Sequence, residues 1–462
     1  MQKTDFLLTK IIATLGPASS SIEVISKLIL EGVRVFRINF SHGLFSEYEV
    51  LLDTIRKAEN ETGLYVAVMG DLSGPKIRVG KVIEGGVMLE KGKQVIFVKK
   101  SVITGEAGSE MVFSCTLPEF IDEVKTGEQI LLDDGNVRLE CTGKKGEGEN
   151  AVLHCSVING GKITTAKGIN LPDTQLSVPA MTEKDFRCAE FAVSKGFDYL
   201  ALSFVRSGAD VKMLKNKLTE LGARPKNDVL TSGDMGFSKK NENLKKYIPV
   251  ISKIEKPQAL KNLESILEET DGVMVARGDL GVEMDLAEVA ILQKQIINMC
   301  QEFGKPVIVA TQMLQSMIDS PVPTRAEVSD VANAIFDGAD AVMLSGETAV
   351  GKYPVETVRM MSRVAWRTNN YIKTNHLETG KTIRKSSLSN RTAAIAHGVR
   401  TIVEDIDPKF LVLWTKLGGS AVYLSRYRMS IPIIVFSNDE ERQATFSVVR
   451  HKTSGNEYTK IR

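Results

Sequence analysis

The chain has 462 residues, of which 43% are hydrophobic and 25% are charged, so its length suggests two to four globular domains of roughly 150 residues each. Its 59 Lys and Arg residues nearly balance 57 Asp and Glu residues, and the net charge of +2 gives no reason to expect nucleic acid or an anionic membrane as a partner. The start, MQKTDFLLTK, lacks the apolar run of a signal peptide, and no apolar stretch approaches the ~20 residues of a membrane span. Five scattered cysteines without metal-ligand spacing favour a reducing, cytoplasmic location.

Eight short apolar segments rich in β-branched residues recur along the chain, and most are separated by one amphipathic stretch such as 286–304. They span residues 10–17, 34–41, 65–72, 198–206, 249–255, 272–280, 306–313 and 341–348. Apolar strands that alternate with helices are typical of a parallel sheet that is covered on both faces. Eight of them predict an α/β fold built on a closed (β/α)8 TIM barrel.

The third and fourth predicted strands are separated by an interval far longer than an ordinary connection. Its alternating, turn-rich stretches, 91–100, 127–140 and 150–162, predict a small inserted β-barrel domain. This insertion leaves and re-enters at the active-site end of the barrel, so we expect a lid that closes over the site; the alternative is an insertion without a role in catalysis. The predicted domains are the first part of the barrel, 10–75; the lid, 76–177; the second part of the barrel, 178–370; and a C-terminal α/β domain, 371–462.

Polar residues gather at or near the carboxyl ends of the predicted strands, the end of a TIM barrel that carries the active site. They are Thr14, Arg37, Asn39, Ser41, Asp71, Ser203, Arg206, Lys253, Glu255, Arg277, Asp279, Thr311, Gln312, Ser345 and Glu347. Lys253 and Glu255 are two apart on one strand and point to the same face, where an isolated charge would be costly to desolvate. A purely structural ion pair is the alternative, and the converging ring makes it the less favoured one.

Glu255 and Asp279 belong to neighbouring predicted strands, and two carboxylates plus substrate oxygens suit a hard divalent cation such as Mg²⁺ or Mn²⁺. Lys253 and Arg37 add fixed positive charge beside that position. A metal ion and two cations around one pocket favour phosphoryl transfer, in which catalysis is mostly positioning and charge neutralisation. The backbone N–H groups of the turn at 276–281 are candidates for holding a substrate carboxylate or phosphate.

Six segments match, in order, the motifs of one family: FRINFSHG (36–43), ISKIE (251–255), VARGDLGVE (275–283), ATQML (310–314), PTRAE (323–327) and DAVMLSGET (340–348). The chain resembles pyruvate kinase from about residue 10 to the mid-430s. The resemblance implies a glycolytic, cytoplasmic enzyme that transfers the phosphoryl group of phosphoenolpyruvate to ADP, giving pyruvate and ATP. It also implies Mg²⁺ or Mn²⁺ as a cofactor and a homotetramer as the assembly.

The resemblance assigns roles to the residues of the ring. Lys253 would neutralise the phosphoryl group in flight, while Glu255 and Asp279 would bind the divalent metal. Arg37 would hold the transferring phosphate, and Thr311 would help deliver a proton to the enolate.

The remaining positions carried over from the resemblance bind substrates. The amides of Gly278 and Asp279 would bind the substrate carboxylate. The positions expected to face the nucleotide phosphates are Asn39, His42, Arg78 and Lys167, of which Lys167 would arrive from the lid on closure.

The potassium site of the family departs from its usual pattern. Potassium-dependent members place the ion at positions that are here Asn39, Ser41, Asp71 and the Leu72 carbonyl. The usual DTKGPE reads DLSGPK at 71–76, with Leu72 in place of threonine and Lys76 in place of glutamate. In this family that pair accompanies potassium independence, and an ammonium on a flexible stem can supply the charge of the ion. We expect activity without potassium; the alternative is a Lys76 that points into solvent at the lid hinge.

Three further segments differ from the family. Val350 stands where the family commonly has a lysine that reaches the nucleotide phosphates, and Lys352 is the candidate replacement. Residues 222–247 are expected to be a mobile loop on the barrel face opposite the chemistry. In the C-terminal domain, residues 415–428 resemble the loop that binds one phosphate of a sugar-phosphate activator, with Thr415, Lys416 and Ser420 as contacts. That domain is expected to lack the family's last strands and second effector loop, so regulation of the usual kind is not expected.

Two other functions stay open on the sequence alone. A catalytically weak relative that serves as a binding or regulatory protein is suggested by the short C-terminal domain and by Val350, but the intact ring argues against it. A metal-dependent barrel lyase that cleaves pyruvate-containing compounds would share the metal and the enolate chemistry. It leaves Lys167 and the lid without a role.

Overall fold

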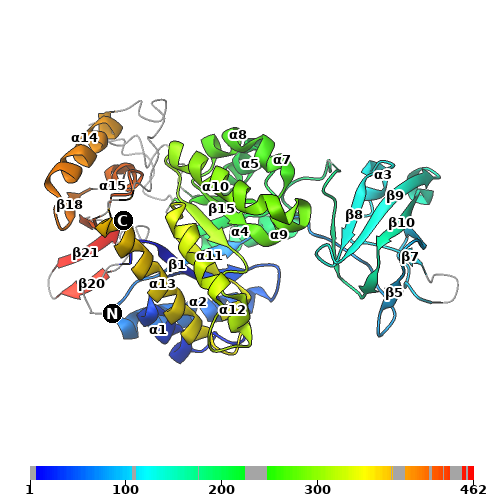
Figure 1. Cartoon of the computed structure of the whole chain (residues 1–462), viewed down its shortest axis with the longest axis horizontal. Coiled ribbons are helices and arrows are strands. Elements are labelled where there is room, and N and C mark those ends of the chain that lie inside the picture. The colour runs from blue at the N-terminus through cyan, green and yellow to red at the C-terminus, as the bar shows by residue number, and fades with distance from the viewer. Residues whose placement is uncertain are drawn as a thin grey trace.

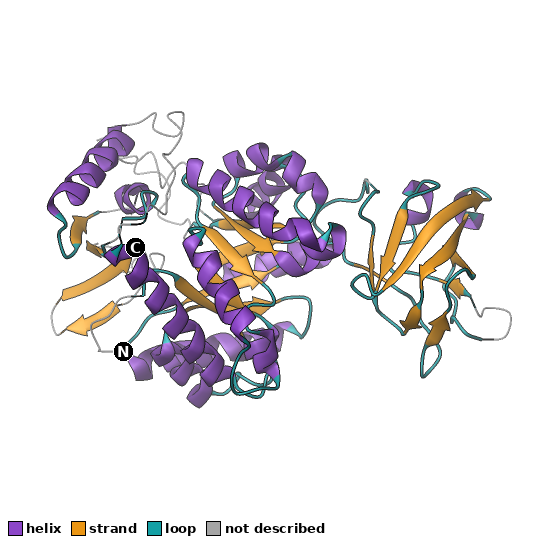
Figure 2. Ribbon diagram, in the orientation of Figure 1, coloured by secondary structure: helices purple, strands orange, loops and turns teal. Residues whose placement is uncertain are grey.

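The computed structural model describes residues 7–106, 111–174, 176–223, 247–375, 377, 391–415, 419–429, 431–436, 450–453 and 456–461. Eight parallel strands close into a barrel around which helices are arranged (Figure 2). In order around the barrel they are β1 (Lys10–Thr14), β17 (Ala341–Leu344), β16 (Val307–Ala310), β15 (Gly272–Ala276), β14 (Val250–Ile254), β13 (Tyr199–Leu202), β3 (Ala67–Asp71) and β2 (Val33–Asn39). The predicted TIM barrel is confirmed.

Most of the barrel strands are shorter than predicted at their carboxyl ends. The segment predicted at 306–313, for example, ends as a strand at Ala310. Thr311 and Gln312 follow it with φ angles of 72° and 53°, in the left-handed region that a strand does not contain. The residues that were predicted as strand ends form the rim of the barrel instead. The polar side chains expected there therefore still lie at the barrel mouth.

Helices between the strands cover the outside of the barrel, and their ends follow the sequence signals for helix caps. Ser21 accepts a hydrogen bond from the Val24 amide at the start of the first helix, and Thr182 forms a capping box with Asp185. The helices are α1 (Ile22–Glu31), α2 (Phe45–Thr62), α4 (Glu183–Lys195), α5 (Gly208–Glu220), α7 (Pro257–Lys261), α8 (Leu263–Glu269), α9 (Arg277–Glu283), α10 (Leu286–Glu302), α11 (Arg325–Phe336), α12 (Gly346–Ala349) and α13 (Pro354–Thr374), with a 3-10 turn, η2, at Gln315–Ile318.

Two layers of apolar side chains hold the barrel together. The larger core lies between the strands and the surrounding helices and includes Phe36, Phe40 and Phe197. A smaller core fills the inside of the barrel, where Met69, Met274 and Met343 are nearly inaccessible to solvent. The barrel is therefore a packed scaffold, and the space for ligands lies at its mouth.

The long insertion folds as a separate β domain with its own core, as predicted. Its main sheet forms a half barrel of seven strands in the order β4-β12-β8-β9-β10-β6-β7. Strands β11 and β5 form a second, two-stranded sheet. The elements are β4 (Ile77–Arg78), β5 (Val87–Leu89), β6 (Gln94–Val98), β7 (Val112–Phe113), α3 (Phe120–Glu123), β8 (Gln129–Leu132), β9 (Val137–Lys145), η1 (Gly148–Asn150), β10 (Val152–Asn159), β11 (Gly161–Ile163) and β12 (Gly168–Asn170).

The C-terminal α/β unit has a four-stranded sheet in the order β18-β19-β21-β20. Its elements are α14 (Arg391–Ile406), β18 (Leu411–Trp414), α15 (Gly419–Ser425), β19 (Ile433–Phe436), β20 (Arg450–Thr453) and β21 (Asn456–Ile461). Two strands that were not predicted follow β19: β21 pairs with β19 and β20 pairs with β21, both in antiparallel register. The sequence DEERQATFSVV at 439–449 predicts one further helix. That segment and nearly all of the loop predicted at 222–247 lie outside the described residues.

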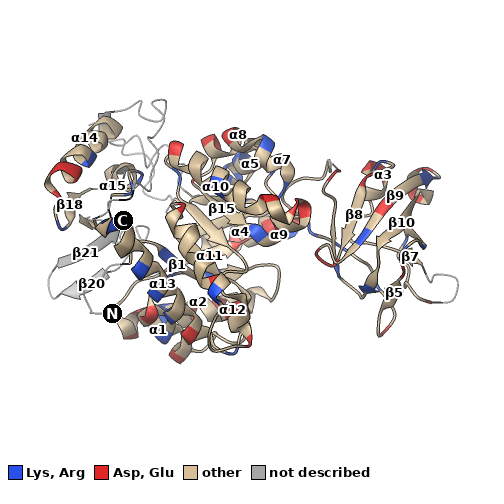
Figure 3. Cartoon of the chain, in the orientation of Figure 1, with Lys and Arg blue, Asp and Glu red and all other residues tan. Residues whose placement is uncertain are grey.

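The lid and the C-terminal unit lie at opposite ends of the barrel (Figure 1). The guanidinium of Arg428 joins the C-terminal unit to the barrel through an ion pair of 2.5 Å with Asp340, directly before β17. Lys and Arg residues are interspersed with Asp and Glu residues along the helices (Figure 3), in line with the nearly balanced charge. Within the described ranges, no helix is both long and apolar enough to cross a bilayer.

The packing of the lid generates a stability prediction. Phe97 is fully buried, and its ring centre lies 5.8 Å from that of Phe113 and 5.5 Å from that of Phe120. Phe97→Ala should lower the free energy of unfolding of the lid by about 3 to 5 kcal/mol, because it leaves a cavity in the hydrophobic core of that domain. Hydrogen–deuterium exchange resolves lid peptides from barrel peptides and measures the loss directly.

The matched control is Ile158→Ala, since Ile158 is a lid residue whose side chain is 46% exposed. It should change lid protection by about 0.5 kcal/mol or less. Equal protection of the lid in the two variants would contradict the packing described for Phe97.

Candidate active site

The mouth of the barrel brings together side chains from four neighbouring strands. Arg37 projects from β2, Asp71 ends β3, Ser203 follows β13 directly, and Lys253 lies near the end of β14. Because parallel register aligns Arg37 with Met69 and Asn39 with Asp71, the ends of the strands lie at one level. The ring predicted from the sequence is present for these residues.

The ammonium of Lys253 is held at three points at the barrel mouth. Its Nζ donates to Ser203 Oγ at 2.8 Å and forms ion pairs with Glu255 Oε1 at 2.9 Å and Asp71 Oδ1 at 3.3 Å. Only 9% of the residue is exposed. Burial acts to lower the pKa of Lys253, but the two carboxylates outweigh it and the pKa is raised, so the side chain is a fixed cation.

The Asp71 carboxylate is shared between two cations. Arg37 donates from Nε to Asp71 Oδ2 at 2.6 Å, while the other carboxylate oxygen lies next to Lys253. Although burial favours the protonated form, Arg37 and Lys253 hold the pKa of Asp71 below its usual value. Thr14 completes the arrangement by accepting a hydrogen bond of 3.1 Å from Arg37 and donating one of 2.9 Å to the Leu344 carbonyl.

Glu255 presents one carboxylate oxygen that has no aligned hydrogen bond within the described part of the chain. Its Oε2 accepts from the Phe204 amide at 2.7 Å, whereas Oε1 has only the nearby Lys253 charge and is inaccessible to solvent. Burial raises the pKa of Glu255, and Asp279 adds to the rise because a second carboxylate lies within range.

The side chains of Glu255 and Asp279 fit a site for a divalent cation. The described residues contain no group of three or more Asp, Glu, His or Cys side chains that could enclose a metal ion. Magnesium requires no such group, since it keeps several waters and binds through one or two carboxylates plus substrate oxygens. A buried carboxylate oxygen that has only the Lys253 charge as a partner, within electrostatic range of the Asp279 carboxylate, fits that coordination.

Thr311 lies on the opposite side of the mouth in a strained backbone conformation. Its φ of 72° is unfavourable for a β-branched residue and is typical of functional sites. Its Oγ1 accepts from the Gly278 amide at 2.7 Å and donates to the Ala310 carbonyl at 2.5 Å. The Gly278 amide, predicted to bind a substrate carboxylate, is therefore engaged by Thr311 here. Arg277 supports the turn by donating to the Thr311 carbonyl at 2.8 Å.

The residues predicted to bind the nucleotide are only partly brought together. His42 is exposed at the mouth, and its pKa is lowered by partial burial and then by the charges of Arg78 and Lys184. Arg78 donates to the Ala166 carbonyl at 3.0 Å within the lid. Lys167 forms an ion pair of 2.5 Å with Asp133, also in the lid, and the lid extends away from the barrel (Figure 1).

The predicted potassium positions lie close to the ring. Asn39 Oδ1 accepts from the Ser41 amide at 3.1 Å, and the Leu72 carbonyl accepts from Ser203 Oγ at 2.6 Å. Lys76 is about one-third exposed, and its Nζ lies 3.9 Å from Asp279 Oδ1. Lys76 therefore points toward a metal-ligand candidate and not simply into solvent.

The remaining candidates lie away from the ring. Val350 is 62% exposed, and Lys352 forms an ion pair of 2.8 Å with Asp319, also at the surface. In the C-terminal unit, Thr415 is buried and Ser420 is half-buried, while Lys416 lies outside the described residues.

Sequence reasoning missed Phe204 as a contributor to the site. Phe204 has a φ of 53°, and this conformation turns its amide toward Glu255. No sequence signal could have found it, because a left-handed phenylalanine is rare and is not foreshadowed by its neighbours. The pairing of Asn170 with Glu283, described below, was missed as well.

Residues 7–358 match the family profile described as pyruvate kinase, barrel domain, and residues 393–454 match the one described as pyruvate kinase, alpha/beta domain. The chain is 41% identical to a pyruvate kinase of Corynebacterium glutamicum over 94% of this chain and 83% of the relative. It is 40% identical to a pyruvate kinase of Mycobacterium tuberculosis over 93% and 83%. A crystal structure of a pyruvate kinase from Cryptosporidium parvum superposes with a TM-score of 0.81 at 33% identity, over 95% of this chain and 85% of that one.

The shared Asp71 carboxylate generates a pH-dependent prediction. Because the pKa of Asp71 is lower in the folded chain, the carboxylate stabilises the fold above the unfolded pKa of about 3.9, and this contribution is lost as pH falls through the folded pKa. Asp71→Asn should therefore cost about 3 to 5 kcal/mol at pH 7, where it leaves two cations without their shared partner. The cost should shrink below about pH 4.

Urea unfolding followed by the emission of Trp366, in a Trp414→Phe background, measures the difference at each pH. Exposed Asp53 supplies the control, since Asp53→Asn removes a carboxylate from the surface of α2. A cost for Asp71→Asn that does not vary with pH would show that the charge of Asp71 is not what stabilises the ring.

Proposed function

The chain belongs to the pyruvate kinase family, and from that membership we propose that it transfers the phosphoryl group of phosphoenolpyruvate to ADP and protonates the resulting enolate to pyruvate. The observation that carries this proposal is the buried Lys253 ammonium, held beside Glu255 at the mouth of the barrel. Packing alone gives no reason for a lysine and two carboxylates there, since each charge is costly to bury. A binding or regulatory protein gives no use to this arrangement, and a barrel lyase gives no use to Lys167 and the lid.

Each cation of the ring has a proposed task. Lys253 stabilises negative charge on the phosphoryl group as it passes between the two substrates, and Arg37 holds the same group in line. Asp71 keeps both side chains in place, so little reorganisation is needed during the reaction. Since Lys253 is already fixed by three contacts, its charge is preorganised for this role.

Glu255 and Asp279 are the proposed ligands of Mg²⁺ or Mn²⁺, which would supply charge neutralisation at the transferring phosphate. The amides of Gly278 and Asp279 are proposed to bind the substrate carboxylate. Substrate binding would then compete with Thr311 for the Gly278 amide, and this exchange would free the Thr311 hydroxyl. Thr311 is proposed to help deliver the proton to the enolate carbon, through its hydroxyl and a water molecule.

Lid closure is the proposed means of assembling the nucleotide site. Asn39, His42 and Arg78 would face the ADP phosphates, and Lys167 would leave Asp133 to join them. A partly exposed ion pair such as Lys167–Asp133 stabilises the fold by about 1 kcal/mol, so exchanging it for a phosphate is a small cost. Closure would also exclude water from the transferring group.

Lys76 is proposed to replace the potassium ion that would otherwise lie among Asn39, Ser41, Asp71 and the Leu72 carbonyl. Its flexible stem and its position near Asp279 support a role inside the mouth. Cytoplasmic location and a homotetramer are proposed from the family. Regulation through Thr415, Lys416 and Ser420 is proposed to be weak, because a single anion-binding loop supplies few contacts.

Lys253→Met should reduce turnover by more than about 1,000-fold, because it removes a fixed charge that neutralises the phosphoryl group. Pyruvate formation from phosphoenolpyruvate and ADP measures turnover, and electron paramagnetic resonance of free Mn²⁺ measures metal binding, which should persist. Lys294→Met is the matched control, since Lys294 is an exposed residue of α10. Normal turnover in Lys253→Met would refute the role assigned to this lysine.

The proposed potassium independence predicts that replacing choline chloride with potassium chloride changes turnover of the unaltered enzyme by less than about twofold, since the Lys76 ammonium supplies the charge. Lys76→Glu should lower turnover by about tenfold or more in choline chloride and regain it with potassium, because the carboxylate restores demand for a monovalent cation. Steady-state assays at constant ionic strength separate the two effects. A strict requirement for potassium in the unaltered enzyme would overturn the role of Lys76 and leave the phosphoryl transfer intact.

A further inference from the structure

A buried polar cluster joins the lid to the barrel. Asn170, the last residue of β12, donates from Nδ2 to Glu283 Oε1 at 2.9 Å. Lys256, on the turn after β14, forms an ion pair with the same oxygen. Asn170 is 6% exposed and Glu283 is 5% exposed, so the three side chains form a desolvated contact, which we call the hinge anchor.

The hinge anchor lies close in the chain to three residues of the candidate site. Each of its members is within four residues of one of them: Asn170 of Lys167, Lys256 of Glu255, and Glu283 of Asp279. Glu283 ends α9, the same short helix whose first turn carries Asp279. The lid strand β12, which directly follows Lys167, is therefore joined to the two segments that bear the metal-ligand candidates.

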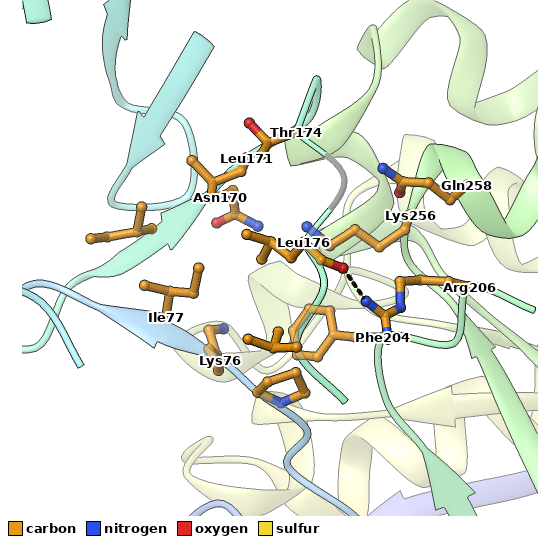
Figure 4. Close-up of a pocket in the computed structure, with 13 residues that line it drawn as sticks. Lys76, Ile77, Asn170, Leu171, Thr174, Leu176, Phe204, Arg206, Lys256 and Gln258 are labelled. Carbon is orange, nitrogen blue, oxygen red and sulfur yellow. Dashed lines mark hydrogen bonds between the residues drawn. The ribbon is translucent and has the colours of Figure 1, made fainter. Parts of the chain in front are cut away.

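A cavity borders the hinge anchor and is lined from both domains (Figure 4). Ile77 and Asn170 contribute from the lid, while Phe204 and Lys256 contribute from the barrel, and the side chains of Asn170 and Lys256 point toward one another. The Nζ of Lys256 lies 5.7 Å from the centre of the Phe204 ring. Since the Phe204 amide donates to Glu255, the packing at the hinge also reaches a metal-ligand candidate.

We propose that Asn170 and Glu283 are positioning residues for the phosphoryl transfer, and that the hinge anchor is the fixed point about which the lid closes. A hydrogen bond to a buried carboxylate is directional and costly to break, so it restricts the paths that the lid can take. The lid motion that the hinge anchor still allows brings Lys167 to the nucleotide phosphates. This inference rests on the proposed function, and it adds two residues that touch neither substrate.

The test is Asn170→Ala, which removes the link between lid and barrel but keeps the Lys256–Glu283 ion pair. The KM for ADP should rise and kcat should fall, each by about tenfold, because the loss of a hydrogen bond to a charged group leaves Lys167 poorly placed. The KM for phosphoenolpyruvate and the affinity for Mn²⁺ should stay within about twofold, because their proposed ligands belong to the barrel. A merely structural residue would not separate the two substrates in this way.

The matched control is Asn159→Ala, since Asn159 is an exposed lid residue that donates only within the lid, to the Asn136 carbonyl at 3.0 Å. An exchange of groups supplies the second arm. Asn170→Asp alone opposes two carboxylates and should raise the KM for ADP, whereas Asn170→Asp with Glu283→Gln restores one donor and one acceptor across the hinge. The double variant should recover to within about threefold of the unaltered enzyme, because the hydrogen bond is remade with its polarity reversed.

Three outcomes would overturn the inference. One is an ADP KM in Asn170→Ala equal to that of Asn159→Ala. Another is an equal loss for both substrates together with a lower melting temperature, which would mark Asn170 as structural. The third is a double variant no better than Asn170→Asp. The unaltered enzyme is assayed first. If it forms no pyruvate, the proposed function is refuted, and the inference that rests on it is refuted as well, before any variant is measured.

Discussion

The carboxylate of Asp71 is the charge on which the mouth of the barrel depends. It lies at the end of β3 with almost no exposure, and it joins Arg37 of β2 to Lys253 of β14. Two cations so close together would repel one another without it, and neither could stay desolvated. The parallel register of the closed barrel supplies the geometry, because it ends adjacent strands at one level. The same carboxylate therefore holds the two cations in position for the site and neutralises them for the fold.

The two sides of the site are held in place by different interactions. The cation side is held by buried ion pairs on strands, which are rigid and strongly coupled. The opposite side is held by left-handed backbone at Thr311, where strain orients a hydroxyl against the Gly278 amide. The lid is held in a third way, since it is a separate β domain in which Lys167 pairs with Asp133, and Asn170 bonds across to Glu283 of the barrel. Buried ion pairs, strained backbone and a contact between domains thus hold the three parts in place.

The sequence predicted the barrel and most of the ring because both follow from local patterns. Apolar runs marked all eight strands, and the residues that follow them are at the mouth by the geometry of the fold. It could not predict Phe204 or the exact strand ends, because left-handed conformations at Phe, Thr and Gln are imposed by tertiary packing. The contact of Asn170 with Glu283 spans 113 residues and two domains, so no local spacing reveals it. The β20–β21 hairpin was missed because its polar composition resembles that of a disordered tail.

Closure of the barrel requires the first strand, β1, to pair with β17, which is synthesised late. Lys10 of β1 pairs with Ala341 of β17, so the two residues are 331 positions apart in the chain (341 minus 10). A ribosome that adds about 5 to 20 residues per second needs roughly 15 to 65 s to make that interval, and β1 lacks one neighbour throughout. The described lid core draws on residues from Ile77 to Leu176 and can be complete within the first half of translation. The nascent chain therefore carries a finished β domain between two unfinished halves of a barrel, and its open sheet edges are the surface that chaperones must shield.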